Sequence, residues 1–428
     1  MVPEKCACWH VAMLYGDESS KGGGAVMTDI KIAKNLLRVE PSASSIASQR
    51  ARTLKAEGRD IIALSAGEPD FATPEHVIEA AFDAARRGET RYTNAAGTPA
   101  LKAAVIEKFK RENDLDFADD EVMTGNGGKQ ILYNAMLSTI EEGDEAIIPA
   151  PYWIAYVDLV MLAGGTPVIV KCPVENDFKL TADALEAAIT PRTRWLIINS
   201  PSNPSGAVYS AQELREIADV LVRHPHVAVL SDDMYEHILY DGATFATIAK
   251  VAPELKDRTI TVNGVSKVYA MTGWRIGYCG GPAPLIKQMV KLQQQTTGST
   301  CSVAQAAAVA AITGPQDFVK PRTESFRERR DLVVSMINQA HGLSCPVPAG
   351  AVYVFPSCAD LIGKKTPDGK VIENDTDLVM YFLESEGVAV VQGAAYGLSP
   401  FFRISFAASE DDLIQACERI QRACAELR

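Results

Sequence analysis

The strongest constraint on the fold is a regular alternation of helical patterns with short apolar runs, which starts near residue 73. The apolar runs cover residues 145–148, 166–170, 195–198, 227–230, 259–262 and 276–279. Runs of this length and composition are typical of strands, and helical patterns separate most of them. This is the order of βαβ units, so the sequence predicts an α/β fold built on a mostly parallel sheet.

The segments on either side predict further elements. Thr73 and Pro74 resemble an N-cap and the first position of a helix that ends at Gly88, and a second helix is expected over residues 99–112. A long helical stretch over residues 302–339 is followed by expected strands at 351–355, 388–391 and 402–406. A last helix starts after Ser409, which with Asp412 resembles a capping box.

These patterns predict a large domain over residues 73–320 and a smaller α+β domain over residues 321–428. Residues 27–72 are expected to form an N-terminal arm and part of the small domain. Residues 1–26 show no clear periodicity and no signal-peptide pattern, so we expect a disordered extension and regard Met27 as an alternative start.

Charge and cysteine usage exclude several classes of protein. The net charge of −12 and the lack of a local basic patch argue against nucleic acid or an anionic membrane as partner. No apolar run is long enough to span a membrane. The nine cysteines are odd in number and form no C-x-x-C pair, which favours reduced thiols in a cytoplasmic protein over disulfides or a zinc site.

Polar side chains follow three successive predicted strands. Asn203 comes after the first, Asp232 and Tyr235 after the second, and Lys267 after the third. Ligands of open α/β sheets gather at the carboxyl ends of strands, so we expect these side chains to meet at one site. Asn203 could instead be a turn residue and Asp232 a helix N-cap, and most lysines are solvated surface residues.

The surroundings of Lys267 suggest covalent chemistry. Gly264 and Ser266 allow close approach, and Arg275 follows within reach of the same site as an anion clamp. A lysine in an apolar pocket loses its proton more easily, and the neutral amine attacks carbonyl groups. The pairing indicates a Schiff-base lysine with a phosphate-bearing cofactor.

A glycine-rich segment, GNGGKQ, joins a short apolar run to a helical pattern and includes Gly127, Gly128 and Lys129. Glycines at a helix start expose backbone N–H groups that suit phosphate. Gln130 stands where a dinucleotide fingerprint has its third glycine and where a Walker loop has Ser or Thr, so neither motif is present. A tight strand-to-helix turn explains the glycines equally well.

The segments AGEPDFATPEH, RYTNAAGTPALKAA, GGKQILYNA, APYWIAY, NSPSNPSGAVY, SDDMYEHI, VSKVYAMTGWRIGY and FRISFA, in this order, resemble class I aminotransferases. The similarity is greatest to the bacterial aspartate aminotransferase branch and covers roughly residues 30 to 425. It implies the fold type I of enzymes that depend on pyridoxal phosphate: a large domain with a mostly parallel seven-stranded sheet, and a smaller α+β domain.

The resemblance also implies roles at the cofactor. Lys267 would bind the cofactor as a Schiff base and then move a proton, and Asp232 would pair with the ring nitrogen. Tyr235 and Asn203 would bind the phenolic oxygen of the ring, and Trp153 would stack on the ring face unless it is simply a core aromatic. The phosphate would be held by Gly127, Gly128, Ser266, Arg275 and, from the partner subunit of a homodimer, Tyr92.

For the substrate, the resemblance implies that Arg403 grips the α-carboxylate through a two-pronged hydrogen bond and that Gly67 packs near it. Lys129 would read the distal carboxylate of aspartate or glutamate, with Ser42 and Ser44 nearby.

Three positions depart from the family pattern. Gly264 replaces a frequent phosphate-binding serine, and Asp233 replaces a more usual glutamate. Glu40 stands where relatives that use prephenate tend to carry a basic residue, which counts against that activity.

The predicted function is therefore amino transfer between aspartate and 2-oxoglutarate in two half-reactions at one site. The alternatives are an aminotransferase for aromatic or neutral amino acids or for prephenate, a pyridoxal phosphate lyase or synthase of the same fold, and a transcription regulator with a degenerate aminotransferase domain. The regulator would need an additional DNA-binding domain, and residues 1–26 are too short to form one.

Overall fold

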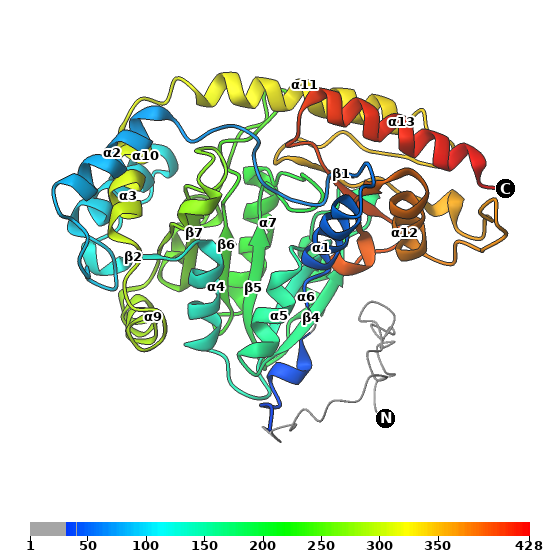
Figure 1. Cartoon of the computed structure of the whole chain (residues 1–428). Coiled ribbons are helices and arrows are strands. Elements are labelled where there is room, and N and C mark those ends of the chain that lie inside the picture. Colours follow the sequence, from blue (N-terminus) through cyan, green and yellow to red (C-terminus); the bar gives the residue numbers. More distant parts are fainter. Residues whose placement is uncertain (1–30, 40) are drawn as a thin grey trace.

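A seven-stranded sheet forms the centre of the molecule in the computed structural model, which describes residues 31–39 and 41–428 (Figure 1). The strands are β2 (Val122–Gly125), β3 (Glu145–Ala150), β4 (Thr166–Lys171), β5 (Thr193–Asn199), β6 (Ala228–Asp232), β7 (Thr259–Gly264) and β8 (Gly277–Gly280). Their order is β2-β8-β7-β6-β5-β3-β4, and only β8 runs antiparallel to its neighbours. The predicted α/β fold with a mostly parallel sheet is confirmed.

Helices cover both faces of this sheet, as Figure 1 shows. One face packs against α4 (Gly128–Leu137), α5 (Ala155–Leu162) and α9 (Ala283–Thr296), and the other against α6 (Ala182–Ala188), α7 (Ala211–Arg223) and α8 (Ile248–Val251). Successive strand residues alternate between the faces: Ile147 packs in one apolar cluster and Ile148 in the other. Burial on both faces explains why the strands read as unbroken apolar runs.

Three further helices, α2 (Glu75–Arg86), α3 (Pro99–Asn113) and α10 (Ser302–Thr313), share one apolar cluster at the β2 edge. The predicted cap at Thr73 is wrong: Pro74 is the N-cap of α2, and the Thr73 hydroxyl donates to the Ala270 carbonyl at 2.8 Å. The predicted stop is confirmed, since Gly88 follows the helix with a φ of +80°. The long helical stretch expected over residues 302–339 is helical but divided into two helices. Gly314 ends α10 because Pro315 disfavours a helical conformation before it, and α11 (Val319–Ile337) starts afresh.

The C-terminal part combines α11, α12 (Asp375–Glu386) and α13 (Glu410–Glu426) with the three-stranded sheet β11-β12-β9. These strands are β9 (Tyr353–Val354), β11 (Val391–Gln392) and β12 (Phe402–Ser405). The run predicted at residues 388–391 is split into β10 (Val388–Ala389) and β11, which belong to different sheets. Ser409 caps α13 as predicted, and its hydroxyl accepts from the Asp412 N–H at 3.2 Å.

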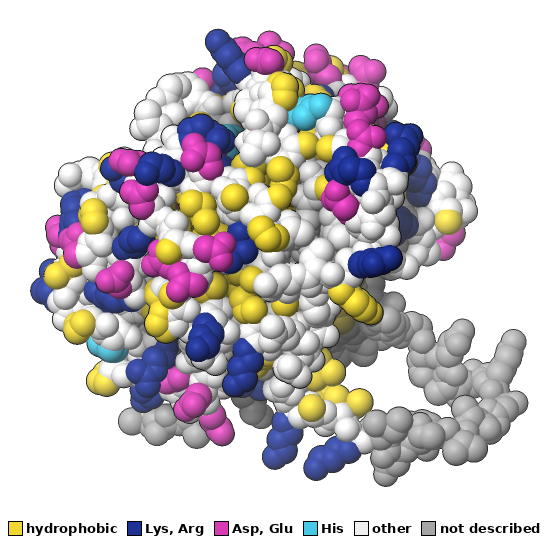
Figure 2. Space-filling model, turned by 90° about the vertical axis from the view of Figure 1, so that its left-hand side faces the viewer, with side chains coloured by type: hydrophobic (Ala, Val, Ile, Leu, Met, Phe, Trp, Pro, Cys, Tyr) yellow, Lys and Arg dark blue, Asp and Glu magenta, His cyan; other side chains and the backbone are white. Residues whose placement is uncertain are grey.

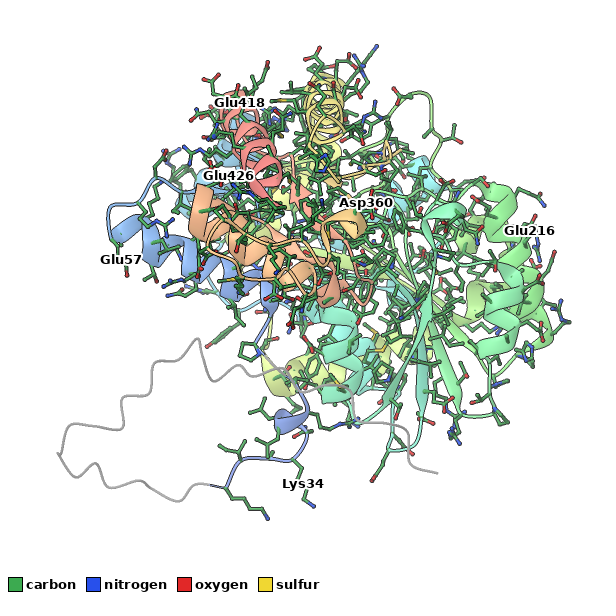
Figure 3. All side chains as sticks on the ribbon, turned by 90° about the vertical axis from the view of Figure 1, so that its right-hand side faces the viewer. Lys34, Glu57, Glu216, Asp360, Glu418 and Glu426 are labelled. Carbon is green, nitrogen blue, oxygen red and sulfur yellow. The ribbon has the colours of Figure 1, made fainter. Side chains whose placement is uncertain are left out.

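The N-terminal segment reaches this C-terminal part. Strand β1 (Ile62–Ala63) pairs in parallel with β10, and α1 (Ala43–Ala56) packs beside them through Ala51 and Leu54. Figure 3 shows α1, with Glu57 just after its end, near the helix that carries Glu418 and Glu426. The domain boundaries themselves stay a prediction.

Several sequence-based expectations fall on residues that the structure does not describe. These are the disordered extension at residues 1–26, Met27, Cys6 and Cys8, Glu40, and the side chain of Ser44. Among the described residues, no helix is long and apolar enough to cross a membrane.

Candidate active site

A cavity of about 480 Å³ opens at the carboxyl ends of β5, β6 and β7, beside the first turn of α4. It brings together most residues that the sequence singled out: Gly67, Gly128, Lys129, Trp153, Asn203, Asp232, Tyr235, Ser266, Lys267, Arg275 and Arg403. Gly127 adjoins it, whereas Tyr92 is fully exposed and does not line it. The expectation that the polar strand ends meet at one site is therefore confirmed.

Lys267 lies in the turn that follows β7. Its ammonium donates to the Gly67 carbonyl at 2.7 Å and lies 5.3 Å from the centre of the Tyr235 ring. The glycine at position 264 has a steric reason, because a Cβ there would lie 3.1 Å from the Ile276 carbonyl oxygen and 3.3 Å from the Gly277 Cα. A Cβ at this position would be in unusually tight contact with the backbone at the start of β8, so this packing favours glycine.

Asp232 ends β6 and is buried at the inner wall of the cavity. The Tyr156 hydroxyl donates to its carboxylate at 2.6 Å, and the Met234 N–H does so at 3.3 Å. Burial raises the pKa of Asp232, against the hydrogen bond from Tyr156 and the charge of Lys267, which lower it. The helix N-cap alternative is wrong, since the next α-helix of the described chain, α8, starts only at Ile248.

Asp233, the neighbouring carboxylate, does not line the cavity. It accepts a hydrogen bond from the Ser231 hydroxyl at 2.7 Å, and burial raises its pKa to about 7. It therefore lies below the site and does not contact the cavity contents.

Arg403 projects from β12 and is buried. Its guanidinium donates to the Asn203 side-chain oxygen at 3.0 Å and to the Ser65 carbonyl at 2.5 Å, and its Nε has no partner among the described residues. The rings of Tyr353 and Tyr396 flank it, with centres 4.5 and 5.1 Å from its Cζ. An arginine held between two rings, with its head group at a cavity, is suited to bind a carboxylate in a fixed orientation.

The glycine-rich turn forms the floor beneath Arg275. Gly127 has a φ of +81°, and a Cβ there would lie 2.4 Å from the Arg275 Nη2. Within the described part of the chain, Arg275 itself donates only to the carbonyls of Thr272 and Asn126, at 3.0 and 3.4 Å. Glycine is thus needed both for the left-handed backbone and for the approach of the guanidinium, beside the free N–H groups that open α4.

Lys129 is exposed at the cavity, with its ammonium 5.1 Å from the centre of the Trp153 ring. Burial lowers the pKa of Lys129. The carboxylate of Asp158 on α5 raises this pKa, whereas the charge of Arg275 lowers it further. Asp158 was not singled out in the sequence, although it lies on α5, which begins two residues after the predicted Trp153.

The cavity also contains residues that the sequence analysis missed. Tyr156 follows Trp153 by one helical turn, so this spacing within APYWIAY could have revealed it. Tyr353, whose hydroxyl lies 2.7 Å from that of Tyr235, is part of an apolar run and gave no signal. From α1, Ser45, Ser48 and Arg52 line the cavity; Ser42, predicted nearby, does not.

The family described as aminotransferase class I and II matches residues 59–420. The chain belongs to this family. Among characterised relatives, this aminotransferase is 59% identical to a protein named aspartate aminotransferase from Rhizobium meliloti, with 88% of this chain and 92% of the relative covered. It is 57% identical to a probable aspartate/prephenate aminotransferase from Rhizobium leguminosarum, with 92% and 98% covered.

A solved structure gives the same result. The crystal structure of the aspartate aminotransferase from Rhizobium meliloti superimposes with a TM-score of 0.91 at 56% sequence identity, and the match covers 93% of this chain and all of that one. The resemblance to class I aminotransferases and the implied fold type I architecture are both confirmed.

Proposed function

We propose that this chain is an aspartate:2-oxoglutarate aminotransferase that works with pyridoxal phosphate. The observation that carries the proposal is one cavity in which Lys267 is accompanied by a buried carboxylate, Asp232, and by two separate cations, Arg403 and Lys129. A lysine amine can bind a carbonyl cofactor, and two cations suit a substrate with two carboxylates. The names of the relatives support the same specificity.

The residues present fit pyridoxal phosphate. Because burial raises the pKa of Asp232, its carboxylate gains from a cationic partner such as a protonated ring nitrogen. The opening N–H groups of α4 and the Arg275 guanidinium suit the phosphate, and the absence of a side chain at Gly127 keeps this cradle open. Ser266 would add a hydroxyl there, and Trp153 an aromatic face for the ring.

When bound, the cofactor supplies a carbonyl carbon for the amino group and a ring that takes up electron density. Lys267 would hold the cofactor covalently, and its amine would move the proton that leaves the substrate α-carbon. The hydroxyl of Tyr235, already fixed by Tyr353, and the amide of Asn203 would bind the ring oxygen.

Substrate binding falls to the cations. Arg403 would orient the α-carboxylate, and Lys129 would bind the distal carboxylate of aspartate or, in the second half-reaction, of 2-oxoglutarate. Gly67 leaves the space for the substrate beside Tyr353, because a Cβ there would collide with the Tyr353 hydroxyl. A related enzyme that lacked the distal cation would lose its preference for dicarboxylates.

Borohydride reduction of the protein with its cofactor, followed by peptide mapping, tests the site, and amino transfer from aspartate to 2-oxoglutarate tests the activity. We expect the label on Lys267 and turnover with both dicarboxylates. A label on another lysine would exclude the proposed site, and elimination without transfer to 2-oxoglutarate would favour a lyase.

A second candidate is an aminotransferase that also accepts prephenate, since the Rhizobium leguminosarum relative is named aspartate/prephenate aminotransferase. Glu40, the residue that counts against it, lies outside the described residues. Half-reaction spectra with prephenate, tyrosine and alanine, compared with those for aspartate and 2-oxoglutarate, distinguish the two candidates.

The proposal includes a homodimer in the cytoplasm. Tyr92 is fully exposed outside its own cavity, as a residue that serves the phosphate of a second copy would be. Figure 2 views the side of the molecule on which α2 and α10 lie, with apolar side chains gathered near its middle. The described cysteines are all free, which suits a reducing compartment. Light scattering should give twice the mass of one chain.

A further inference from the structure

A buried ionic cluster lies behind the cavity, around the carboxylate of Glu236. Lys108 of α3 forms an ion pair with it, and both side chains are almost completely buried. Two asparagines complete its coordination: Asn113 donates to Oε2 at 2.6 Å, and Asn263 donates to Oε1 at 2.7 Å. Every oxygen of this carboxylate is therefore hydrogen-bonded, which is the condition under which a buried charge is tolerated.

Other charged groups face the same cluster. The Lys108 ammonium also donates to the Asn113 oxygen at 2.8 Å and lies 3.6 Å from the Glu112 carboxylate. His237 lies 3.0 Å from Glu112 and 3.7 Å from Glu236. Although burial alone would raise it, Lys108 and His237 hold the pKa of Glu236 below its ordinary value. Glu236 thus stays an anion, and its hydrogen bonds persist.

This cluster joins the segments that carry the two catalytic side chains of the proposed reaction. Glu236 directly follows Tyr235, whereas Asn263 belongs to β7 and precedes the turn that holds Lys267. The Asn263 oxygen also accepts from the Gly264 N–H at 2.7 Å, so the strand end itself is fixed. On the cavity side, the Lys267 ammonium lies 5.3 Å from the Tyr235 ring centre.

We propose that Asn263 and Glu236 are positioning residues that set the placement of Lys267 relative to Tyr235, and that Lys108 holds this pair to α3. The inference deepens the proposed function and rests on it. A shift of either segment would move the lysine amine relative to the phenol, and small displacements of reacting groups reduce catalysis strongly.

The two asparagines provide a matched experiment. Both are buried, with 2% and 6% exposure for Asn263 and Asn113, and each donates one hydrogen bond to Glu236. They differ in location, since Asn263 lies on the strand that leads to Lys267 and Asn113 lies at the end of α3. Asn263→Ala and Asn113→Ala should therefore cost similar thermal stability but differ at the active site.

The readouts are the melting temperature, the pH at which the absorption spectrum of the bound cofactor changes, and kcat and KM for aspartate. We expect Asn263→Ala to shift the spectroscopic midpoint and lower kcat by roughly tenfold with little change in KM. Asn113→Ala should retain the wild-type midpoint and kcat. If Asn263→Ala does not fold, Asn263→Ser keeps an acceptor for the Gly264 N–H and is too short to reach Glu236, so it replaces the alanine variant.

Equal shifts in both variants, or no shift in either, would overturn the positioning role and leave the cluster a purely stabilising one. The double variant Lys108→Met/Glu236→Gln gives an independent check because it removes both buried charges together. If this double variant has the stability of the wild type but a shifted spectroscopic midpoint, the result supports the inference. If both its stability and its midpoint are those of the wild type, the result contradicts the inference. A wild-type protein without a cofactor band would overturn the proposed function and this inference together, an outcome that is distinct from all the others.

Discussion

The cavity has two sides that differ in how completely the chain satisfies its own polar groups. On the ring-nitrogen side, formed by Asp232 and Tyr156, the two side chains are hydrogen-bonded to each other. On the anion-binding side, formed by Arg275, Lys129 and Arg403, Arg275 contacts only backbone carbonyls, and the Arg403 Nε is unpartnered among the described residues. The fold organises the first side, whereas under the proposed function ligands and a second copy would complete the second.

This comparison predicts which kinetic quantity each substitution changes. Substitutions on the ring-nitrogen side should act on kcat and on the cofactor spectrum, because those groups are already in place before substrate binds. Substitutions on the anion-binding side should act on kcat/KM and on the choice of substrate.

The largest effect is expected for Lys267→Ala, because both sides act through this amine. Loss of the covalent link and of the proton transfer should lower kcat by roughly 10⁴-fold. Among the residues that the structure describes, the ammonium makes one hydrogen bond, to Gly67, so the melting temperature of the cofactor-free protein should change by only a few degrees. Lys287→Ala, at an exposed site on α9, is the control; substantial activity in Lys267→Ala would refute the assignment.

Arg403→Lys should have the next largest effect. A lysine cannot form a two-pronged hydrogen bond, so kcat/KM for aspartate and for alanine should both fall by about 100-fold. Arg422→Lys, in an exposed pair with Glu386, should change neither. If kcat fell while KM stayed constant, Arg403 would belong with the ring-nitrogen side instead.

Lys129→Met separates the two carboxylates of the substrate. We expect kcat/KM to fall roughly tenfold or more for aspartate and 2-oxoglutarate and by less than about twofold for alanine. Equal losses for all three would remove Lys129 from substrate selection.

The wild-type enzyme gives a pH test of the same residue. Burial lowers the pKa of Lys129, and the charged form, present below that pKa, is the one that binds a carboxylate. As the pH increases, the KM for aspartate should therefore begin to rise at a lower pH than the ordinary pKa of a lysine predicts. The KM for alanine should show no such rise. Asp158→Asn removes the opposing carboxylate and should move this rise to lower pH.

Tyr156→Phe should have the smallest effect. It removes the 2.6 Å hydrogen bond to Asp232, so the pKa of this carboxyl should rise further and kcat should fall about fivefold. Tyr209→Phe removes a buried hydroxyl that accepts from the Leu180 N–H at 2.7 Å away from the active-site cavity. Tyr209→Phe should lower the stability by a comparable amount and leave kcat unchanged. Equal losses of kcat in Tyr156→Phe and Tyr209→Phe would remove the contrast between the two sides of the cavity.

Much of the fold was predictable because both faces of the central sheet are buried, which leaves unbroken apolar runs in the sequence. The errors arose where one local signal competed with another. Threonine is a residue type that often caps helices, yet the Thr73 hydroxyl donates to the Ala270 carbonyl. The helical pattern across residues 302–339 concealed the break at Gly314 and Pro315. Single-sequence periodicity does not register such tertiary contacts.

The site was predictable where chemistry and position coincided, as at the polar strand ends. It was not predictable where a residue reaches the cavity from an ordinary helix or strand. Tyr353 and Arg52 come from segments far apart in the chain, and nothing local distinguishes them from core or surface residues. The Glu236 cluster was missed for the same reason, since Lys108 reads as a normal polar residue of a helix.

The pairing of β1 with β10 has a consequence for protein synthesis. Residues 62 and 63 leave the ribosome before every strand of the central sheet, whereas their strand partners at residues 388 and 389 leave after all seven of these strands. Strand β1 therefore has no partner strand while the central sheet is being made. Arg403, which is proposed to bind the substrate α-carboxylate, is made later still, so the proposed substrate site is complete only after the whole central sheet has been made.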